Sequence, residues 1–344
     1  MMRNKLLFTI LAVGSISLCS CGVGNHHDTS EYFTKDIAWK EGFKILQLGD
    51  IHLGAKDDLE KHFAFMDLTI KEANADLIIV CGDLFTFAEV RTMESFFQFL
   101  DSYKTPWTVT FGNHDEQCNF SLVAMTSYLN NFNSYCYFKD IQDDDVYGNA
   151  NFAINLKDGS NVKYQVYLFD SNRYNYGKGF GYDNIHQDQV DWYRRMVEYS
   201  YDTYGSAIPS VNFFHIPCQE YQTAYDIWKA NGEQDTDEVK YYSGECRESV
   251  SCSKISDDLF ETMIALKNEN KGNSVGIFTN HDHVNDLDIK YKGIRLVYGI
   301  HSTDRIYHDD DLLGGLLITL RSTPDAKGDL FTTQAILHSY GKIK

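Results

Sequence analysis

Residues 43–52 read FKILQLGDIH, an apolar run that ends in glycine, aspartate and histidine. The same arrangement returns in LIIVCGD at 77–83 and in WTVTFGNHD at 107–115. Apolar runs of this length are typical of buried strands, and the amphipathic stretches between them, 59–75 and 93–103, have helical spacing. The alternation of strand and helix predicts an α/β fold in which helices cover a buried sheet.

The second half of the chain continues this mixture. We expect further helices at 187–201 and 257–267, and further strands at 151–156, 164–169, 211–214, 275–279, 295–298 and 316–320. Residues 218–272 are rich in Gly, Asp, Glu and Ser, and we expect this polar stretch to leave the core and form a wall over the site. Since no repeat or proline-rich linker interrupts 41–344, we interpret this range as one domain.

The composition limits the possible functions. The 344 residues include 49 acidic and 31 basic side chains, which gives a formal net charge of −18. Such a surface repels nucleic acid backbones, and no run of Lys and Arg offsets it, so a nucleic-acid-binding module is disfavoured. A phosphate-bearing substrate would need local positive charge, for which bound metal is the natural source.

Residues 1–20 have the features of an export signal. Arg3 and Lys5 precede an apolar run, 6–18, that is too short to span a bilayer comfortably. The sequence LCSCG at 18–22 resembles a bacterial lipoprotein cleavage box with Cys21 as the lipid-bearing residue. We therefore expect a protein of the bacterial cell envelope, anchored through Cys21, with residues 21–40 as a polar tether. An ordinary secretory signal or a short anchor helix is the alternative.

Export places the cysteines in an oxidising compartment. Cys246 and Cys252 are close in sequence within a polar stretch, so they are the pair we expect to be joined if any are. Cys81 ends an apolar strand and is interpreted as a buried thiol.

The residues most informative about function come directly after predicted strands. They are Asp50, His52, Asp83, Asn113, His114, Asp115, His215, His281 and His283. One Gly-Asp pair alone is usually a turn and one histidine alone is usually structural. Their repetition after successive strands indicates a shared site, because ligands in such folds gather at the carboxyl ends of strands. Carboxylate, amide and imidazole ligands together suit Mn, Fe or Zn.

In order along the chain, GDIH, GD, GNHD, FFHIP and HDHVND resemble the calcineurin-like metallophosphoesterase superfamily, closest to its purple-acid-phosphatase-like branch. The resemblance implies a βαβ sandwich with two central mixed β-sheets flanked by helices. It also implies two metal ions that share Asp83. The other ligands would be Asp50, His52 and His283 for one ion, and Asn113, His215 and His281 for the other.

This resemblance implies hydrolysis of phosphate monoesters or diesters through a hydroxide that bridges the two metals. His114 would be the general acid, and Asp115 would orient it and favour its charged form. The substrate would be a small phosphate ester or a phosphopeptide. Two alternatives remain open: a cell-surface lipoprotein that binds metal or phosphate without turnover, and a structural lipoprotein.

Two positions depart from the family pattern. Asn280 stands where the family usually has glycine before the paired histidines, and we expect asparagine to allow the left-handed backbone of that turn. Thr86 stands where classical purple acid phosphatases carry a ligating tyrosine, so no tyrosinate-to-iron colour is expected. His186, His301 and Asp170 are assigned no catalytic role.

Overall fold

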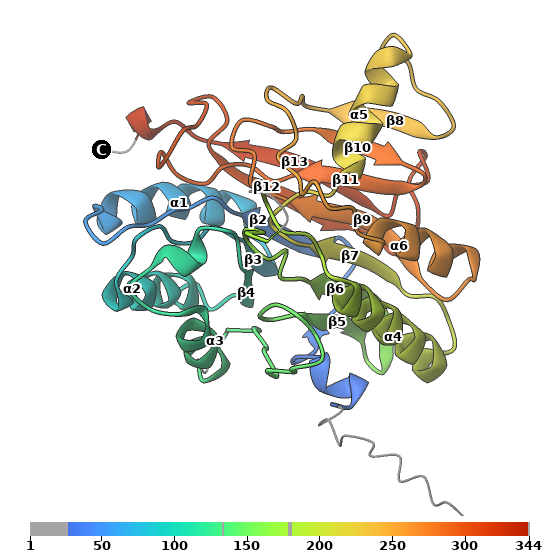
Figure 1. Cartoon of the computed structure of the whole chain (residues 1–344), viewed down its shortest axis with the longest axis horizontal. Helices are drawn as coiled ribbons and strands as arrows, with labels where there is room; N and C mark the ends of the chain where they lie inside the picture. The colour runs from blue at the N-terminus through green and yellow to red at the C-terminus, as the bar shows by residue number, and fades with distance from the viewer. Residues whose placement is uncertain (1–26, 133, 178–180, 343–344) are drawn as a thin grey trace, which may run out of the picture.

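The computed structural model describes residues 27–132, 134–177 and 181–342. Two mixed β-sheets lie at the centre and helices cover their outer faces (Figure 1), so the predicted α/β sandwich is confirmed. The expected signal segment and Cys21 lie outside the described residues. In the part of the chain that is described, no helix combines the length and the apolar character needed to cross a bilayer.

The smaller sheet has five strands in the order β13-β12-β2-β3-β4. Their bounds are Lys44–Leu48 for β2, Leu77–Cys81 for β3, Trp107–Thr110 for β4, Gly314–Leu320 for β12 and Phe331–Leu337 for β13. Strands β2, β3 and β4 are parallel, whereas β12 runs antiparallel to β2 and β13. Every residue of β3 is buried, as expected for a central parallel strand of continuous apolar sequence.

The larger sheet has eight strands in the order β1-β5-β6-β7-β9-β11-β10-β8. Their bounds are Ile37–Ala38 for β1, Phe152–Asp158 for β5, Asn161–Leu168 for β6, Pro209–Phe213 for β7, Val239–Ser243 for β8, Asn273–Thr279 for β9, Asp288–Tyr291 for β10 and Ile294–Tyr298 for β11. Strands β6, β7, β9 and β11 are parallel to one another, so their carboxyl ends reach the same edge.

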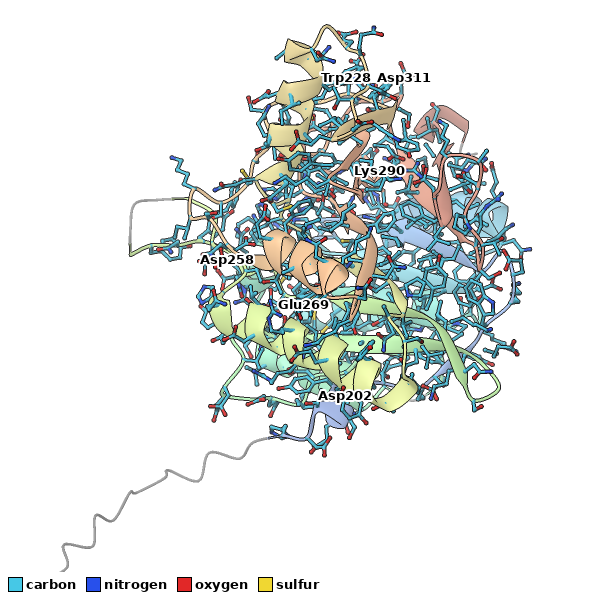
Figure 2. The ribbon with its side chains drawn as sticks, turned by 90° about the vertical axis from the view of Figure 1, so that its right-hand side faces the viewer. Asp202, Trp228, Asp258, Glu269, Lys290 and Asp311 are labelled. Atoms are coloured by element: carbon cyan, nitrogen blue, oxygen red, sulfur yellow. The ribbon has the colours of Figure 1, made fainter. Side chains whose placement is uncertain are left out.

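Three helices cover each outer face. Helices α1 (Leu59–Ala73), α2 (Val90–Asp101) and α3 (Leu122–Asn130) lie on the side of the five-stranded sheet (Figure 1). Helices α4 (Gln187–Tyr204), α5 (Glu220–Ala230) and α6 (Leu259–Asn268) cover the eight-stranded sheet (Figure 2). The described chain also has short 3-10 helices, η1 (Thr29–Tyr32), η2 (Asp115–Gln117) and η3 (Tyr340–Lys342).

The core between the two sheets is rich in aromatic rings. Phe213 and Phe278, on neighbouring strands of the larger sheet, stack with ring centroids 5.0 Å apart. Phe278 also lies 5.2 Å from Phe331 of the smaller sheet. These contacts between the inner faces fix the two sheets against each other, and therefore fix the loops at their common edge.

The segment 29–38 is not part of a tether, contrary to our expectation for residues 21–40. Tyr32 is only 4% exposed and packs against Trp192 of α4, with ring centroids 5.6 Å apart. Strand β1 pairs in parallel with β5. An aromatic residue inside a polar stretch therefore docks this segment on the domain.

Contrary to our expectation, residues 218–272 do not leave the fold as a whole, because parts of this stretch are built into it. Strand β8 pairs with β10 at the edge of the larger sheet, and α6 packs on β9. Trp228 of α5 stacks on Tyr241 of β8 with ring centroids 4.3 Å apart. Residues 231–238 and 244–258 are irregular, and we call the second of these segments the 244–258 loop.

The six described cysteines are all free thiols. The expected pair, Cys246 and Cys252, is therefore not joined. Cys81 is fully buried with its sulfur 3.3 Å from the Phe214 carbonyl oxygen, which confirms the interpretation of a buried thiol.

Candidate metal centre

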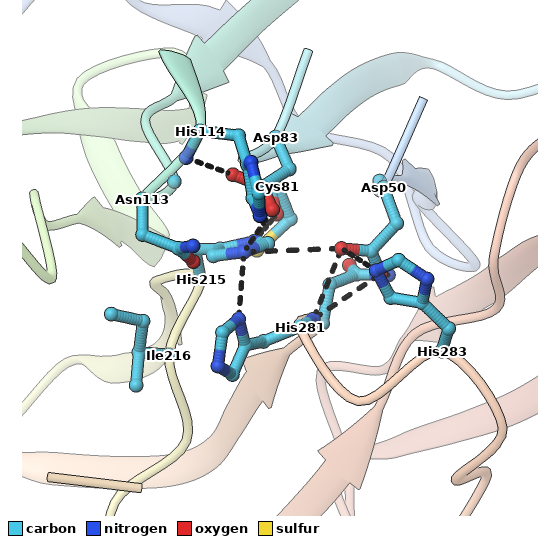
Figure 3. A network of polar contacts seen from close by, with 12 residues as sticks. Asp50, Cys81, Asp83, Asn113, His114, His215, Ile216, His281 and His283 are labelled. Carbon is cyan, nitrogen blue, oxygen red and sulfur yellow. Dashed lines mark hydrogen bonds and ion pairs between the residues drawn. The ribbon is translucent and has the colours of Figure 1, made fainter. Parts of the chain in front are cut away.

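Seven of the predicted site residues meet where five strands end. Asp50, Asp83 and Asn113 follow β2, β3 and β4 of one sheet, while His215 and His281 follow β7 and β9 of the other. His52 and His283 lie two residues further along the first and last of these loops. All seven side chains are buried, none more than 6% exposed. Figure 3 shows Asp50, Asp83, Asn113, His215, His281 and His283 turned toward one another, and His52 lies within reach of the first of them through its ring nitrogen. The predicted residues therefore gather at the sheet edge where we expected a site.

The first group consists of Asp50, His52, Asp83 and His283, whose possible ligand atoms all lie within 4.8 Å of one another. His52 Nε2 and His283 Nε2 are 3.2 Å apart. His283 Nε2 lies 3.6 Å from Asp50 Oδ1, and His52 Nε2 lies 3.6 Å from Asp83 Oδ2. Two imidazole nitrogens that approach each other this closely, each with a buried carboxylate nearby, are arranged as ligands of a common cation.

The second group consists of Asp83, His215 and His281. His215 Nε2 is 3.2 Å from both Asp83 Oδ2 and His281 Nδ1. The same oxygen, Asp83 Oδ2, thus faces His52 in the first group and His215 in the second. Asp83 is the only residue common to both groups among the described residues, as expected for a carboxylate shared by two ions.

Asn113 completes the second group. Its Oδ1 is buried and has no hydrogen-bond partner, whereas its Nδ2 donates to the Tyr174 hydroxyl at 2.8 Å. A buried amide oxygen without a partner is costly, and a metal ion would satisfy it. The donor set therefore fits two metal ions.

Glycines let these side chains approach one another. A Cβ on Gly82 would lie 2.4 Å from the His215 ring, and one on Gly112 would lie 2.3 Å from Asp83 Oδ1. The ligands also have unusual backbones, because Asp50, His52 and Asp83 have φ values of 51°, 51° and 50°. Left-handed non-glycine residues are strained, and their gathering at one place is typical of a functional site.

The chain matches the calcineurin-like phosphoesterase family over residues 43–299. It belongs to that family. It is also 25% identical over 338 residues to "Probable inactive purple acid phosphatase 14" of Arabidopsis thaliana, with 86% of this chain and 79% of that protein covered. Its identity to "Probable inactive purple acid phosphatase 29" of the same plant is 27% over 295 residues, covering 75% and 71%.

Among solved structures, the chain resembles a dimetal phosphatase from Danio rerio with a TM-score of 0.48 and 11% identity. The match covers 81% of this chain and 96% of that one.

In this calcineurin-like phosphoesterase, hydrogen bonds hold the far side of three imidazoles. His215 Nδ1 donates to the Cys81 carbonyl oxygen at 2.9 Å, and His283 Nδ1 donates to the Tyr307 carbonyl oxygen at 2.8 Å. His52 Nδ1 lies 2.8 Å from Thr86 Oγ1. These contacts orient the rings and leave Nε2 of each directed at the centre. Thr86 occupies the position where classical purple acid phosphatases have a tyrosine ligand, and here it supports a histidine instead.

The buried carboxylates and histidines of the centre strongly shift one another's pKa values. Burial lowers the pKa of His52 to about 3. Burial also opposes charge on His215, but the Asp83 and Asp50 carboxylates outweigh it and raise the pKa of His215 to about 9. Burial raises the pKa of Asp83, yet His215 and His52 hold that pKa well below its usual range. Asp83 is therefore an ionised carboxylate, as a metal ligand must be.

His114 and Asp115 differ from each other in position. His114 lies at the edge of the cluster, with its ring centroid 5.0 Å from that of His52, and its Nδ1 is 2.9 Å from Gln117 Oε1. Asp115 instead accepts backbone hydrogen bonds from Gly112 at 2.8 Å and Phe85 at 3.0 Å. Asp115 therefore braces the two loops, and our expectation that it orients His114 is wrong. Gln117 takes that position.

Asn280 also acts differently from our expectation. The left-handed residue of its turn is His281, with φ 82°, and not Asn280. The Asn280 side chain accepts a hydrogen bond from Gln47 Nε2 at 2.7 Å and donates to Asp50 Oδ2 at 3.2 Å. A Cβ on Gly49 would lie 2.4 Å from Asn280 Cγ, so glycine at 49 makes room for it. The Asn280 side chain therefore holds Asp50, an expected metal ligand, in place.

Sequence reasoning missed several residues around the centre: Gln47, Thr86, Gln117, Tyr174, Tyr182 and Tyr307. Only Thr86 was singled out, and then for its departure from the family pattern. His301, which was assigned no role, is buried with its ring centroid 4.3 Å from that of His283, and its Nε2 donates to the Arg305 carbonyl oxygen. The His301 ring therefore packs against that of the expected metal ligand His283.

Proposed function

We propose that this protein is a phosphoric ester hydrolase, a phosphomonoesterase or phosphodiesterase, that works with two metal ions. The observation that carries the proposal is the position of Asp83 Oδ2, which lies 3.6 Å from His52 Nε2 and 3.2 Å from His215 Nε2. A shared carboxylate between two sets of imidazoles suits a dinuclear centre. Membership of the calcineurin-like phosphoesterase family supports the same reaction class.

Two bound cations would lower the pKa of a shared water and neutralise charge on the phosphate oxygens. The chain's own residues supply the remaining steps. The Gln117 side-chain oxygen, Oε1, accepts a hydrogen bond from His114 Nδ1–H, so the proton available for transfer is the one on Nε2. In the proposed reaction His114 gives that proton to the leaving oxygen. The His114 backbone N–H, which donates to Asp83 Oδ1 at 2.8 Å, couples its position to the shared ligand.

The metal class we propose is Mn, Fe or Zn. Imidazole nitrogens make up four of the seven expected ligands, and the remaining three are two carboxylates and one amide, a mixture that suits borderline ions. With Thr86 at the position of the usual tyrosine, the loaded protein is expected to lack a tyrosinate-to-iron absorption band.

The test compares metal content and hydrolysis of a chromogenic phosphate ester in three variants. Asp83→Asn should lose metal and activity, because it weakens the shared ligand. His114→Ala should keep both metals and lose about 10²- to 10⁴-fold in rate. His338→Ala, which removes a partly buried histidine beside Phe65 of α1, is the matched control and should change neither. Unchanged turnover in both Asp83→Asn and His114→Ala would overturn the assignment.

A second candidate is a protein that binds metal or phosphate without turnover. It is favoured by the names of two similar plant proteins, both of which are called "Probable inactive". Opposing it are the complete ligand set and His114 at the edge of the centre. Two bound metals with no hydrolysis across monoesters and diesters would decide for this second function.

We also propose export and lipid anchoring through Cys21 at the bacterial cell envelope, on the basis of LCSCG at 18–22. Small phosphate esters or phosphopeptides are then the proposed substrates. Labelling cells with a tagged fatty acid should mark the natural chain and Cys19→Ser but not Cys21→Ser. Equal labelling of both variants would refute Cys21 as the anchor.

A further inference from the structure

Tyrosine rings flank the metal centre on the side of its second group. Tyr182 meets the His281 ring edge-on, with centroids 4.4 Å apart at 90°. Tyr174 stacks on Tyr182 at 5.6 Å, and an antiparallel bridge joins the two residues. The Tyr174 hydroxyl accepts a hydrogen bond from Asn113 Nδ2. Tyr174 and Tyr182 thus each contact one expected metal ligand, Asn113 and His281 respectively. We call Tyr174 and Tyr182 the first wall.

A second tyrosine lies beside the other metal group. The Tyr307 ring stacks on the His283 ring with centroids 4.4 Å apart and planes 11° from parallel. Its backbone oxygen accepts from His283 Nδ1, and its hydroxyl donates to Glu248 Oε1 at 2.9 Å. Half of the side chain remains accessible, at 51% exposure. Tyr307 is the second wall.

The 244–258 loop holds both walls in place. Ser253 Oγ donates to the Tyr182 carbonyl oxygen at 3.0 Å, and the Glu248 N–H donates to Asn285 Oδ1 at 3.0 Å. The Ser251 N–H donates to the Asp282 carboxylate, between the two paired histidines. The loop is thus fixed to the ligand-bearing turn, and the aromatic rings beside the metals are supported on both sides.

The charged side chains near the site loops do not favour a substrate that carries a second anionic group besides its phosphate. Three arginines near the site loops each face a carboxylate: Arg173 faces Glu116 at 3.4 Å, Arg247 faces Asp286 at 2.5 Å and Arg305 faces Asp57 at 2.9 Å. Glu248 adds a negative charge beside Tyr307. Apart from the metals, these side chains offer an additional phosphate or carboxylate little attraction.

Building on the proposed function, we propose that the site selects esters with a single phosphate and a flat, uncharged ring, which packs against Tyr307 and Tyr182. Aromatic rings stack on tyrosine more favourably than saturated rings of similar area. In this arrangement phosphate would bind the metals while the ring packs against the tyrosine side chains beside them. Esters with several anionic groups, including acidic phosphopeptides, are poor substrates because of Glu248 and the neutralised arginines.

The experiment compares benzyl phosphate with cyclohexylmethyl phosphate, which have equal charge and similar leaving alcohols but differ in ring planarity. The expected kcat/KM ratio is about threefold to tenfold in favour of benzyl phosphate. Tyr307→Leu and Tyr182→Leu should each reduce the ratio toward one, and Tyr307→Phe should keep it because the ring remains. Tyr204→Leu, at the end of α4 beside Lys157, is the matched control and should leave it unchanged.

Calorimetry with the two corresponding phosphonates gives a readout that does not need turnover. The metal-loaded protein should bind benzylphosphonate more tightly by the same factor, and Tyr307→Leu should remove that difference. Hydrolysis of both esters without any ring preference would overturn the selectivity but leave the proposed function intact. A ring preference in binding with no hydrolysis of either ester would instead overturn the proposed function alone.

The charge argument is tested with 4-carboxybenzyl phosphate. It should be a poorer substrate than benzyl phosphate, and Glu248→Gln, which still accepts the Tyr307 hydroxyl, should narrow the gap several-fold. An equal rate for both esters in the natural protein, or no effect of Glu248→Gln, would contradict this part of the proposal.

Discussion

Asn280 shows how a single side chain supports the metal centre without being a ligand. It joins buried Gln47 to Asp50, one of the expected ligands. Because both partners are buried, removing the amide leaves polar groups that water cannot easily reach. The cost of such a loss exceeds the net value of the hydrogen bonds themselves.

We therefore expect Asn280→Gly, the residue usual in the family, to lower the free energy of unfolding of the metal-free protein by about 1 to 3 kcal/mol. Urea denaturation measures the change. The control is Asn74→Gly at the end of α1, where the residue already has a left-handed φ of 44° and glycine is well tolerated. A loss of stability no larger than that of the control would show that the side-chain hydrogen bonds of Asn280 do not stabilise the fold.

At this scale, sequence reasoning identified side chains that follow strands but not those that support them. His215 and His281 were found because apolar runs precede them directly. Gln117 was missed, since Asp115 is also near His114 in sequence and only the folded backbone shows that its oxygens turn toward Gly112 and Phe85. Tyr307 was missed because its contact with His283 depends on the path of a loop.

At the scale of elements, a buried ion pair ties the two sheets together. Arg295 of β11 makes two hydrogen bonds of 2.6 Å to Asp288 of β10, and it also donates to Phe331 O and Thr333 Oγ1 of β13 in the other sheet. Both charged side chains are almost fully buried. Removal of one partner would leave an uncompensated buried charge.

Asp288→Ala should accordingly lower the free energy of unfolding by about 3 to 5 kcal/mol while the metal content of the folded protein stays unchanged. Chemical denaturation and metal analysis measure the two quantities. The double variant Asp288→Leu/Arg295→Met, which removes both charges, should recover most of the lost stability. If the single and double variants were equally destabilised, loss of packing and not the unpaired arginine would be the cause.

The elements predicted correctly are those with continuous apolar sequence, such as β3 and β9. Strand β13 was missed because it is an edge strand whose residues 332–335 are partly or fully exposed, and β8 was missed because its sequence, VKYYS, lies within a polar stretch. Both gain their structure from pairing with a neighbour, β12 and β10 respectively. Such tertiary pairing is not visible in local sequence.

For the whole molecule, the sandwich explains why ligands from 50 to 283 meet. The parallel strands β2, β3 and β4 of one sheet and β7 and β9 of the other all end at the same edge, and the aromatic core holds the sheets in register. The fold class was predictable because the ordered motifs restrict the topology. The position of the segment 29–38 was not, since its docking depends on Tyr32 meeting α4.

The central claim is that two metal ions share Asp83. Crystals of the metal-loaded protein, measured at the absorption edge of the metal found by X-ray fluorescence, test it directly. We predict two anomalous peaks, both in contact with Asp83, one also touching Asp50, His52 and His283 and the other Asn113, His215 and His281. A single peak, or peaks that do not touch Asp83, would contradict the account.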